Sequence, residues 1–385
     1  MSPPRPLIAH AVHRFDVGGM ENGLANLING LPESFADHAV IAFTEVNPAF
    51  ARRIRRERVQ LIELHKPPGQ TLRIAPRLWS LLRRLKPVVF HTRNLATLEA
   101  QAVAWAAGVP FRVHGEHGWD MGDLDGSNRR HRHLRQLMRP FVHHQIALSL
   151  PTQRYLTEQV GVSPERVTNL CNGVDTAVFA PAPDRAQARR QLPGFDLPAD
   201  AFVVSAVGRF AAVKNLPMLI DAFARVRAHN PAFAQRARLA LVGDGPQREL
   251  IDASLATHGL DAVTWLPGAR ADVADCLRCA DLLCLPSLAE GISNAVLEAM
   301  ASGLPVIATD VGGNAELIAD QDSGWLVPSG DAEAMAAAIE RYFSNSDLLH
   351  RHSAAARQRA VTQFSLAGMV QGYHRVYSRF ISERH

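Results

Sequence analysis

The sequence predicts an α/β protein with two doubly wound units, each built on a parallel sheet with helices on both faces. Short apolar runs alternate with amphipathic segments through most of the chain, which is the pattern of buried parallel strands and their connecting helices. The pattern starts again near residue 202, after a segment rich in proline. A length of 385 residues also favours two domains over one.

The first unit contains short apolar runs bounded by polar or turn-forming residues, and we interpret these runs as strands. The predicted strands are 7–12, 37–43, 60–64, 88–92, 111–116, 145–149 and 167–170. Amphipathic segments between them predict helices at 21–31, 74–85, 95–107 and 151–159.

The second unit repeats the alternation from residue 202 onward. Its predicted strands are 202–207, 238–242, 263–266, 282–285, 306–309 and 324–327. Its predicted helices are 215–229, 246–258, 269–278, 294–302 and 331–343. Residues 175–200 contain four prolines and polar residues, which predicts an exposed linker. We therefore expect domains at 1–174 and 201–360, and a C-terminal helix at 361–385 that packs back on the first domain.

Composition narrows the class of protein. The chain is 47% apolar and 20% charged, which is typical of a globular protein and excludes a disordered one. No apolar run is long enough to span a membrane, and the apolar segment at 7–12 is too short for a signal peptide, so we expect cytoplasmic residence. Cys276 and Cys279 form a C-x-x-C without a second ligand pair, so neither a metal nor a redox role is expected there.

Two cations follow the first strand of the second unit. Gly208 and Arg209 end that strand, and Lys214 precedes the next helix. Glycine lets backbone approach a ligand, Arg chelates two oxygens and Lys supplies a compact charge, so this turn suits a diphosphate. The alternative is that both are ordinary surface cations. Only 3 of the 41 basic residues are lysines, which favours the specific interpretation of Lys214.

Gly243 and Gly245 begin what resembles a dinucleotide fingerprint, but Arg248 stands where the third glycine is required. A tight structural turn explains the segment, with Pro246 placed to begin a helix. The sequence therefore argues against NAD binding.

Two glutamates flank the start of a later helix. Glu290 lies in the loop, Ser293 or Asn294 caps the helix, and Glu298 lies in its second turn. A loop carboxylate beside free helix N–H groups suits a sugar, and a helix carboxylate suits a ribose diol. The alternative is two solvated glutamates, which the pattern alone favours for Glu298. The turn at Gly312-Gly313 is equally consistent with an anion site and with close packing.

These motifs, in this order and spacing, resemble the retaining GT-B glycosyltransferases of the group 1, sucrose-synthase-like and mannosyltransferase-like family. The resemblance rests on Gly208-Arg209 with Lys214-Asn215, Val242-Gly243-Asp244-Gly245-Pro246, Glu290-Gly291 with Glu298-Ala299-Met300-Ala301, and Gly303-Leu304-Pro305-Val306-Ile307-Ala308. Asn172-Gly173-Val174-Asp175 and Gly18-Gly19-Met20-Glu21 resemble further landmarks of the group, so nearly the whole chain is covered.

The resemblance implies a GT-B fold, two Rossmann-like domains with a nucleotide-diphosphate sugar between them. It implies that Arg209 and Lys214 bind the diphosphate, Glu298 the ribose and Glu290 the donor sugar's hydroxyls. It also implies that main-chain N–H groups near 292–294 assist and that the base lies near 267–270. The further donor-binding residues that it implies are Gly208, Gly243, Arg270, Gly291, Ile292, Ser293 and Asn294. The group often carries an aromatic residue at the position of Ile292, so no sugar packing is implied there.

In the first unit, Gly18-Gly19 is a flexible turn before a helix, which by resemblance touches the donor phosphate or the acceptor; a packing turn is the alternative. His117 follows the strand at 111–116 and precedes Gly118-Trp119-Asp120, and the family places a His at such a strand end, near the donor sugar. His114 and His117 are spaced like a possible metal pair, but strand alternation sends them to opposite faces, so no metal is expected.

The charge is unevenly distributed. Residues 1–170 hold 22 basic and 14 acidic side chains, and the rest hold 19 and 23. Three clusters carry much of the excess: Arg52, Arg53, Arg55, Arg56 and Arg58; Arg83, Arg84 and Lys86; and Arg129, Arg130, Arg132 and Arg135. Few aromatic residues are present, which argues against nucleic acid, and the clusters suit an anionic membrane surface or ordinary solvated helix faces.

We therefore expect a retaining hexosyltransferase that moves a sugar from a UDP- or GDP-linked donor to a glycan or lipid-linked acceptor in cell-surface polysaccharide synthesis. Peripheral attachment to the inner face of the plasma membrane fits its basic first domain. No Asp-x-Asp follows a predicted strand, so neither a metal nor another cofactor is expected. The alternatives are a nucleotide-sugar epimerase of related fold and a non-catalytic membrane-associated adaptor.

Overall fold

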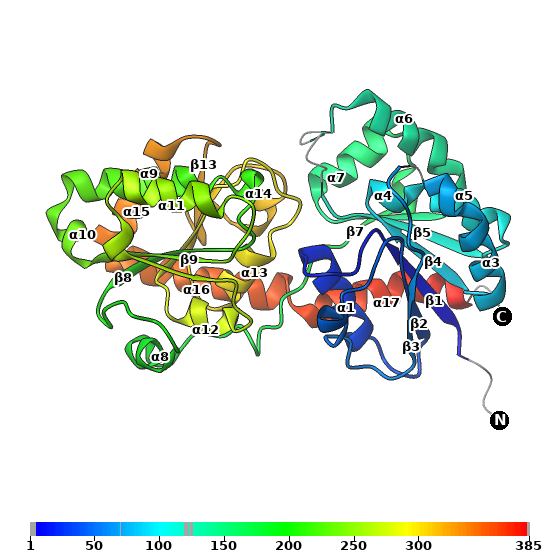
Figure 1. Ribbon diagram of the computed structural model, residues 1–385, viewed down its shortest axis with the longest axis horizontal. Helices are drawn as coiled ribbons and strands as arrows, with labels where there is room; N and C mark the ends of the chain where they lie inside the picture. The colour runs from blue at the N-terminus through cyan, green and yellow to red at the C-terminus, as the bar shows by residue number, and fades with distance from the viewer. Residues whose placement is uncertain (1–4, 70, 119–122, 124–125, 383–385) are drawn as a thin grey trace. The chain divides into compact units, whose positions relative to one another are not determined.

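The computed structural model describes residues 5–69, 71–118, 123 and 126–382 (Figure 1). The chain divides into two compact units. The first comprises residues 1–173 and 366–385, and the second comprises residues 174–365. Both are α/β, as predicted, and each is described by itself.

The first unit is built on a parallel sheet of seven strands in the order β3-β2-β1-β4-β5-β6-β7. The order runs outward in one direction from β1 to β3 and in the other from β4 to β7, so the switch point lies between β1 and β4. Most strand residues are buried, as expected for strands covered on both faces. The strands are β1 Leu7–Val12, β2 Asp37–Ala42, β3 Val59–Glu63, β4 Val89–Arg93, β5 Phe111–Glu116, β6 His144–Ala147 and β7 Val167–Asn169.

The helices of the first unit include one from the far end of the chain. α17, drawn in red in Figure 1, lies beside α1, and Tyr373, Val376 and Tyr377 pack into the same core as Ile8 and Val89. The helices are α1 Gly19–Gly30, α2 Pro48–Ala51, α3 Ala75–Leu85, α4 Leu95–Leu98, α5 Ala100–Ala106, α6 Arg129–Met138, α7 Leu150–Arg154 and α17 Leu366–Ser382.

The second unit is built on a parallel sheet of six strands in the order β10-β9-β8-β11-β12-β13, with its switch point between β8 and β11. The largest core cluster lies on the side of this sheet that α9 and α15 cover. The strands are β8 Phe202–Val207, β9 Ala237–Val242, β10 Thr264–Gly268, β11 Leu282–Leu285, β12 Val306–Thr309 and β13 Gly324–Val327. The helices are α8 Arg185–Gln191, α9 Leu216–His229, α10 Pro231–Arg236, α11 Arg248–Thr257, α12 Val273–Arg278, α13 Asn294–Ala301, α14 Asn314–Leu317, α15 Ala332–Ser344 and α16 Ser346–Gln363.

The segment 175–200, expected to be an exposed linker, packs as part of the second unit. Its helix α8 carries Arg189, whose guanidinium is buried and donates to the carbonyls of Cys279, Ala199 and Ala201. The same guanidinium pairs with Asp281 at 2.6 Å. Proline-rich composition indicated irregular chain correctly, but it could not show these buried hydrogen bonds, which hold the segment against the sheet.

Other boundaries also differ from the prediction. The helix expected at 95–107 is divided into α4 and α5, and the one expected at 151–159 continues from α7 as a π-helix, Tyr155–Gln159. α11 begins at Arg248 rather than at Pro246. The helix expected at 361–385 begins at Leu366, because Phe364 and Ser365 separate it from α16.

Candidate active site

The candidate residues of the second unit gather at its switch point. Gly208, Arg209 and Lys214 follow β8, and Glu290 follows β11, its neighbour in the sheet. The carboxyl ends of two parallel strands whose connections diverge leave room for a ligand between them. Topology therefore brings together residues that lie more than seventy positions apart in the sequence.

The loop after β8 is held by the backbone of the neighbouring loop after β9. Gly208 has a φ of +143°, and the space beside its Cα is open. A Cβ on Gly243 would instead lie 1.9 Å from the carbonyl oxygen of Gly208. The Phe210 N–H donates to the carbonyl oxygen of Asp244 at 2.9 Å. Gly243 thus permits close approach of two backbones, which is the structural turn that the sequence favoured over a dinucleotide site.

Lys214 and Glu290 form an ion pair across the switch point. Lys214 ends a short 3₁₀ helix, Ala212–Lys214, and its Nζ lies 2.5 Å from Glu290 Oε1. Ser287 Oγ donates to the same oxygen at 2.6 Å. The Glu290 side chain is only 9% exposed and that of Lys214 is 25% exposed. Both contacts use Oε1, so Oε2 is the oxygen placed to accept from a further hydroxyl.

The loop that carries Glu290 is fixed on two sides. The Leu288 N–H donates to the carbonyl of Val213 at 2.8 Å, which joins this loop to the one that carries Lys214. On the other side, the Gly313 N–H donates to the carbonyl of Gly291 at 2.9 Å. A Cβ on Gly312 would lie 1.8 Å from the carbonyl oxygen of Glu290. The Gly312-Gly313 turn is therefore closely packed against the Glu290 loop, which favours the packing interpretation.

α13 begins directly beside this loop. Ser293 is the N-cap, and its Oγ accepts from the Val296 N–H at 3.5 Å. Ile292 is buried, with its side chain against Gly313, so it serves as packing at the position where the family often has an aromatic residue. Glu298 is half-buried in the second turn, as predicted from the cap. The N-terminal end of α13 favours negative charge.

The two remaining cations, Arg209 and Arg270, differ in whether their side chains are free to bind a ligand. The Arg209 side chain is exposed and forms no hydrogen bond or ion pair among the described residues, so it is available to a ligand. Arg270 is engaged: it pairs with Asp272 through Nε at 2.8 Å, donates to the carbonyl of Pro193, and lies 5.5 Å from the Trp265 ring. The hydrogen bond to Asp272 raises the pKa of Arg270. Arg270 therefore ties the segment before β8 to the start of α12.

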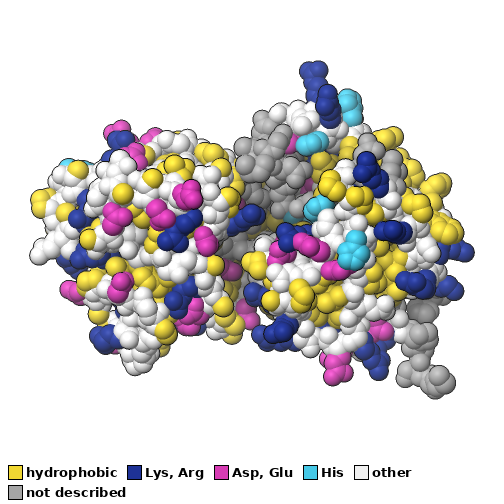
Figure 2. Space-filling model, viewed as in Figure 1, with side chains coloured by type: hydrophobic (Ala, Val, Ile, Leu, Met, Phe, Trp, Pro, Cys, Tyr) yellow, Lys and Arg dark blue, Asp and Glu magenta, His cyan; other side chains and the backbone are white. Residues whose placement is uncertain are grey.

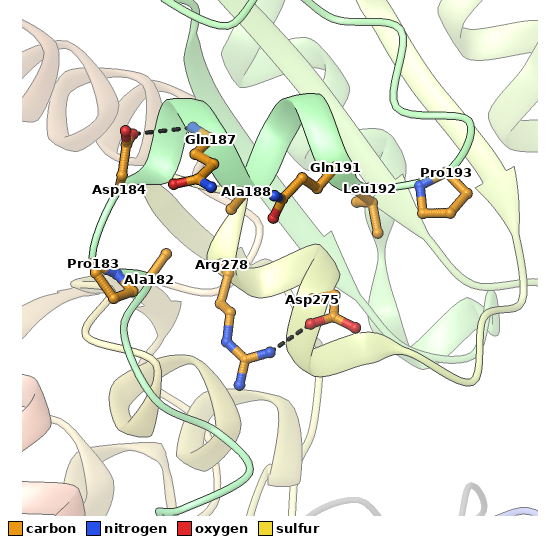
Figure 3. Close-up of a pocket in the computed structure, with 10 residues that line it drawn as sticks. All are labelled: Ala182, Pro183, Asp184, Gln187, Ala188, Gln191, Leu192, Pro193, Asp275 and Arg278. Carbon is orange, nitrogen blue, oxygen red and sulfur yellow. Dashed lines mark hydrogen bonds and ion pairs between the residues drawn. The ribbon is translucent and has the colours of Figure 1, made fainter.

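A pocket elsewhere in the second unit carries no comparable chemistry. It lies between α8 and α12 (Figure 3), and its charged residues are already paired. Arg278 pairs with Asp275 and donates to the carbonyl of Ala180 at 3.1 Å, while Asp184 caps α8 by accepting from the Gln187 N–H. We interpret this pocket as the seam where the proline-rich segment folds onto the unit.

In the first unit, the Gly18-Gly19 turn lies at the switch point between β1 and β4. Gly18 is the N-cap of α1, and a Cβ there would lie 2.2 Å from Glu21 Oε2. The Glu21 carboxylate thus folds over the start of its own helix, and burial raises its pKa. A side chain at position 18 would displace this carboxylate, while the extended backbone of Gly18 (φ −167°) is one that any residue adopts.

His117 is held at the end of β5 by a residue that the sequence did not point to. Its backbone N–H donates to Asn94 Oδ1 at 2.7 Å, and Asn94 has a φ of +60° just after β4. Both ring nitrogens of His117 are buried without a partner among the described residues, and burial lowers the pKa of the ring to about 3. Trp119 and Asp120 lie outside the described residues.

His114 belongs to a different network. Its Nδ1 lies 2.8 Å from Thr92 Oγ1, and its Nε2 lies 3.3 Å from Glu116 Oε1. Arg135 donates to both oxygens of Glu116, and the Arg135 charge holds the pKa of Glu116 at about 2. In the described part of the chain, no three His, Cys, Asp or Glu side chains are grouped as a metal site requires.

Two residues of the site were missed from the sequence. Ser287 contacts Glu290, and its signal was its place directly after a buried strand. Asn94 positions His117, and its signal was an Asn after a strand, where a positive φ is tolerated. The C-x-x-C is buried, and burial raises the pKa of Cys276 to about 12 and of Cys279 to about 11, so both are unreactive thiols near neutral pH.

Comparison with known proteins agrees with this fold. Residues 201–345 match the family described as glycosyl transferases group 1, and residues 17–178 match glycosyltransferase family 4. Anabaena HepE, solved in complex with UDP, is similar over 97% of this chain and 100% of its own, with a TM-score of 0.80 at 21% identity. Sucrose-phosphate synthase from Thermosynechococcus elongatus is similar over 98% of this chain and 100% of its own, with the same TM-score and identity.

Curated relatives point the same way. The D-inositol 3-phosphate glycosyltransferase of Stackebrandtia nassauensis is 37% identical over 213 residues, which are 53% of this chain and 47% of that protein. The chain thus spans about half the length of such relatives. An Escherichia coli galactosyltransferase that acts on a GlcNAc-diphosphoundecaprenol is 27% identical over 78% of this chain and 77% of its own. The chain is a group 1 glycosyltransferase with the GT-B fold.

Proposed function

We propose that this enzyme binds a nucleotide-diphosphate sugar at the β8/β11 switch point and transfers the sugar, with retention, to a hydroxyl of a glycan or lipid-linked acceptor. The observation that carries the proposal is the Lys214–Glu290 ion pair beside the exposed Arg209. HepE has been solved with UDP and with UDP-glucose, which supports a UDP-linked donor, and a GDP-linked one is the second candidate. The galactosyltransferase relative supports an acceptor on a lipid diphosphate.

The residues fit the charge changes of such a transfer. The bond between the anomeric carbon and a phosphate oxygen breaks, and the departing diphosphate keeps the electron pair. Lys214 and Arg209 stabilise that charge, together with the N-terminal end of α13. The acceptor oxygen bonds to the same face of the anomeric carbon, and its proton passes to the departing phosphate. Glu290, oriented by Ser287 and Lys214, accepts from a sugar hydroxyl through Oε2, and Glu298 accepts from the ribose diol.

We also propose that the first unit docks on an anionic membrane through one of its basic clusters. Arg56 and Arg135 are committed to internal contacts: Arg56 donates to the carbonyls of Leu31 and Ala36, and Arg135 pairs with Glu116. All three basic residues of the α3 cluster, Arg83, Arg84 and Lys86, are exposed, whereas the other two clusters combine exposed arginines with the internally bonded Arg56 or Arg135.

Two tryptophans distinguish the surface formed by α3 and the adjoining α5, called the α3 surface below: Trp79 lies on α3 and Trp105 on α5. Trp79 is 45% exposed and Trp105 is 58% exposed, and Arg83 lies 5.9 Å from the Trp79 ring. Exposed tryptophan next to arginine suits a bilayer interface, where each basic residue contributes about 1 kcal/mol near anionic lipid. On the face shown in Figure 2, acidic side chains are interspersed with basic ones over the second unit. Among the described residues, no helix has the length and apolar character needed to cross a bilayer.

The donor site is tested by alanine substitution in the full-length enzyme. Lys214→Ala and Arg209→Ala should each lower kcat/KM for the active nucleotide sugar by about 100-fold or more, since each removes a cation from the developing diphosphate charge. Arg248→Ala is the matched control, because within the described part of the chain the Arg248 side chain forms only an exposed pair with Asp252 one turn along α11. Near-normal rates in both site variants would refute the assignment.

A further inference from the structure

The loop that carries Glu290 leaves the sheet just after β11. The ladder between β11 and β12 ends at Leu285. Alternate residues of a parallel strand bond to the same neighbour, and Leu283 donates its N–H to the carbonyl of Pro305, directly before β12. If the strand continued, Ser287 would be the next residue after Leu285 to bond to β12 through its backbone. Ser287 is also the residue whose hydroxyl contacts Glu290.

Side chains fasten Ser287 to the end of β12. Thr309 is the last residue of β12, and its Oγ1 donates to the Ser287 carbonyl oxygen at 2.6 Å. The Thr309 carbonyl oxygen in turn accepts from Asn314 Nδ2 at 2.9 Å. A continued ladder would have placed the Ser287 N–H at this carbonyl. The side chains of Thr309 and Asn314 thus take the place of two backbone bonds.

The three residues are fully buried, and the direction of each hydrogen bond is fixed. Ser287, Thr309 and Asn314 are each 0% exposed. The Thr309 hydroxyl has one proton, and the Ser287 carbonyl is its nearer acceptor, since the Leu285 carbonyl lies at 3.5 Å. A carbonyl only accepts, so the Asn314 atom that faces Thr309 is the amide nitrogen. The chain of donation therefore runs from Asn314 to Thr309 and from Thr309 to Ser287.

Asn314 makes this contact while one of its own atoms stays unsatisfied. Its Oδ1 is buried without a hydrogen-bond partner among the described residues. An unpaired buried acceptor is unfavourable for folding, and a well-packed apolar side chain would avoid that cost. Stability alone therefore does not favour asparagine at this position. What the residue provides is the bond that holds the Thr309 carbonyl.

The chain of hydrogen bonds ends at the Glu290 carboxylate. Ser287 Oγ donates to Glu290 Oε1 at 2.6 Å, and Lys214 Nζ contacts the same oxygen. Because Oε1 is held in this way, the direction of Oε2 depends on where the backbone places the Ser287 hydroxyl. A carboxylate oxygen distinguishes epimeric sugars by the position of the hydroxyl that donates to it. A displaced Oε2 therefore weakens the binding of one epimer more than that of the other.

We propose that Thr309 and Asn314 are positioning residues that act through Ser287 on Glu290, and that they set how well the donor site distinguishes epimeric sugars. The inference rests on the proposed function, in which Glu290 accepts from a hydroxyl of the donor sugar. In that function the diphosphate binds to Arg209 and Lys214. Substitutions at 309 and 314 should therefore change recognition of the sugar more than recognition of the nucleotide diphosphate.

Sugar recognition is measured by calorimetric titration of the full chain with UDP, UDP-glucose and UDP-galactose. If the enzyme binds GDP instead, then GDP, GDP-mannose and GDP-glucose take their place. Thr309→Val keeps the branched shape and removes the hydroxyl. We expect it to lower the affinity ratio of the preferred to the disfavoured epimer by about three- to tenfold, with a change below about twofold for the nucleotide diphosphate alone. Asn314→Ala should act in the same direction.

Two variants separate positioning from a loss of stability. Thr309→Ser restores the hydroxyl and should recover most of the affinity ratio. Ser205→Ala is the matched control, because Ser205 is a buried residue of the same sheet whose hydroxyl donates to the carbonyl of Leu282 at 2.9 Å, at the opposite end of β11. We expect Ser205→Ala to leave the ratio unchanged. An unchanged ratio in Thr309→Val, or equal changes in Thr309→Val and Ser205→Ala, would overturn the proposal.

Hydrogen exchange in the free enzyme distinguishes failure of this proposal from failure of the proposed function. Thr309→Val should speed exchange of the backbone amides in 287–292 by about three- to tenfold, and Ser205→Ala should not. Equal exchange in Thr309→Val and wild type would overturn the positioning role, even in an enzyme that binds nucleotide sugars. A wild-type enzyme that binds no nucleotide sugar would instead refute the proposed function, while faster exchange in Thr309→Val would still support the positioning role.

Discussion

Gly312→Ala tests whether the Glu290 loop is held in place by backbone contact. The new Cβ would lie 1.8 Å from the Glu290 carbonyl oxygen, and Gly312 has a φ of +56°. A left-handed conformation costs a non-glycine residue about 1 to 2 kcal/mol, and overpacking adds about 1 to 3 kcal/mol. We therefore expect Gly312→Ala to lower the free energy of unfolding by about 2 to 5 kcal/mol and to weaken donor binding, since the loop must move.

Gly330→Ala is the matched control. Gly330 has a φ of +80°, but its Cβ would have no neighbour within 4 Å, so only the conformational cost of about 1 to 2 kcal/mol applies. Urea unfolding midpoints at constant m-value give the difference between the two variants, and calorimetric titration with nucleotide sugar gives donor affinity. Equal destabilisation, or unchanged donor affinity in Gly312→Ala, would refute the reasoning.

Arg189→Met removes a buried guanidinium that donates to three carbonyls and to Asp281, although Asp281 still pairs with Arg185 and accepts from the Val203 N–H, so we expect the free energy of unfolding to fall by about 3 to 5 kcal/mol in urea titrations; a loss below about 1 kcal/mol would show that the proline-rich segment is loosely attached. Burial lowers the pKa of His38 to about 3, so between about pH 6.5 and pH 3 the unfolded chain binds a proton that the folded chain excludes. The free energy of unfolding is therefore unaffected by His38 above about pH 6.5. It falls by about 1.4 kcal/mol per pH unit for this residue as the pH drops towards about 3. Glu116, with its pKa held at about 2, lowers the free energy of unfolding further below about pH 4.5. A urea unfolding midpoint that stays constant from pH 7.5 to pH 5 would contradict the contribution of His38. Trp79→Ala with Trp105→Ala should at least halve co-sedimentation with anionic liposomes, whereas the exposed Leu250→Ala should not, and equal effects would argue against the α3 surface.

The sequence predicted the two parallel sheets because buried strands are short and apolar, and this pattern is local. It also indicated Gly208, Lys214 and Glu290, because strand ends and helix starts fix where unusual residues lie. It did not predict that Lys214 and Glu290 form an ion pair, since that contact depends on β11 lying beside β8. The hydrogen bond from Arg270 to the Pro193 carbonyl has the same character, because the two residues lie 77 positions apart and only the fold brings them together.

The arrangement of the buried histidines could not be predicted from the sequence. Composition revealed many histidines in the first unit but not their arrangement. His91 and Tyr377 are 286 positions apart, and only the packing of α17 against the sheet brings them within 2.7 Å. The basic clusters were similarly ambiguous. Arg56 and Arg135 belong to internal networks, and residue type alone does not separate them from the exposed Arg83 and Arg84.

The central claim is that the donor binds at the β8/β11 switch point, and hydrogen exchange measured with and without UDP-glucose or its GDP counterpart tests it most directly. We predict slower exchange of backbone amides in 208–216 and 287–298 when the active nucleotide sugar is present, with no change in α15. Protection confined to other segments, or equal protection in Lys214→Ala and wild type at matched donor concentration, would contradict it.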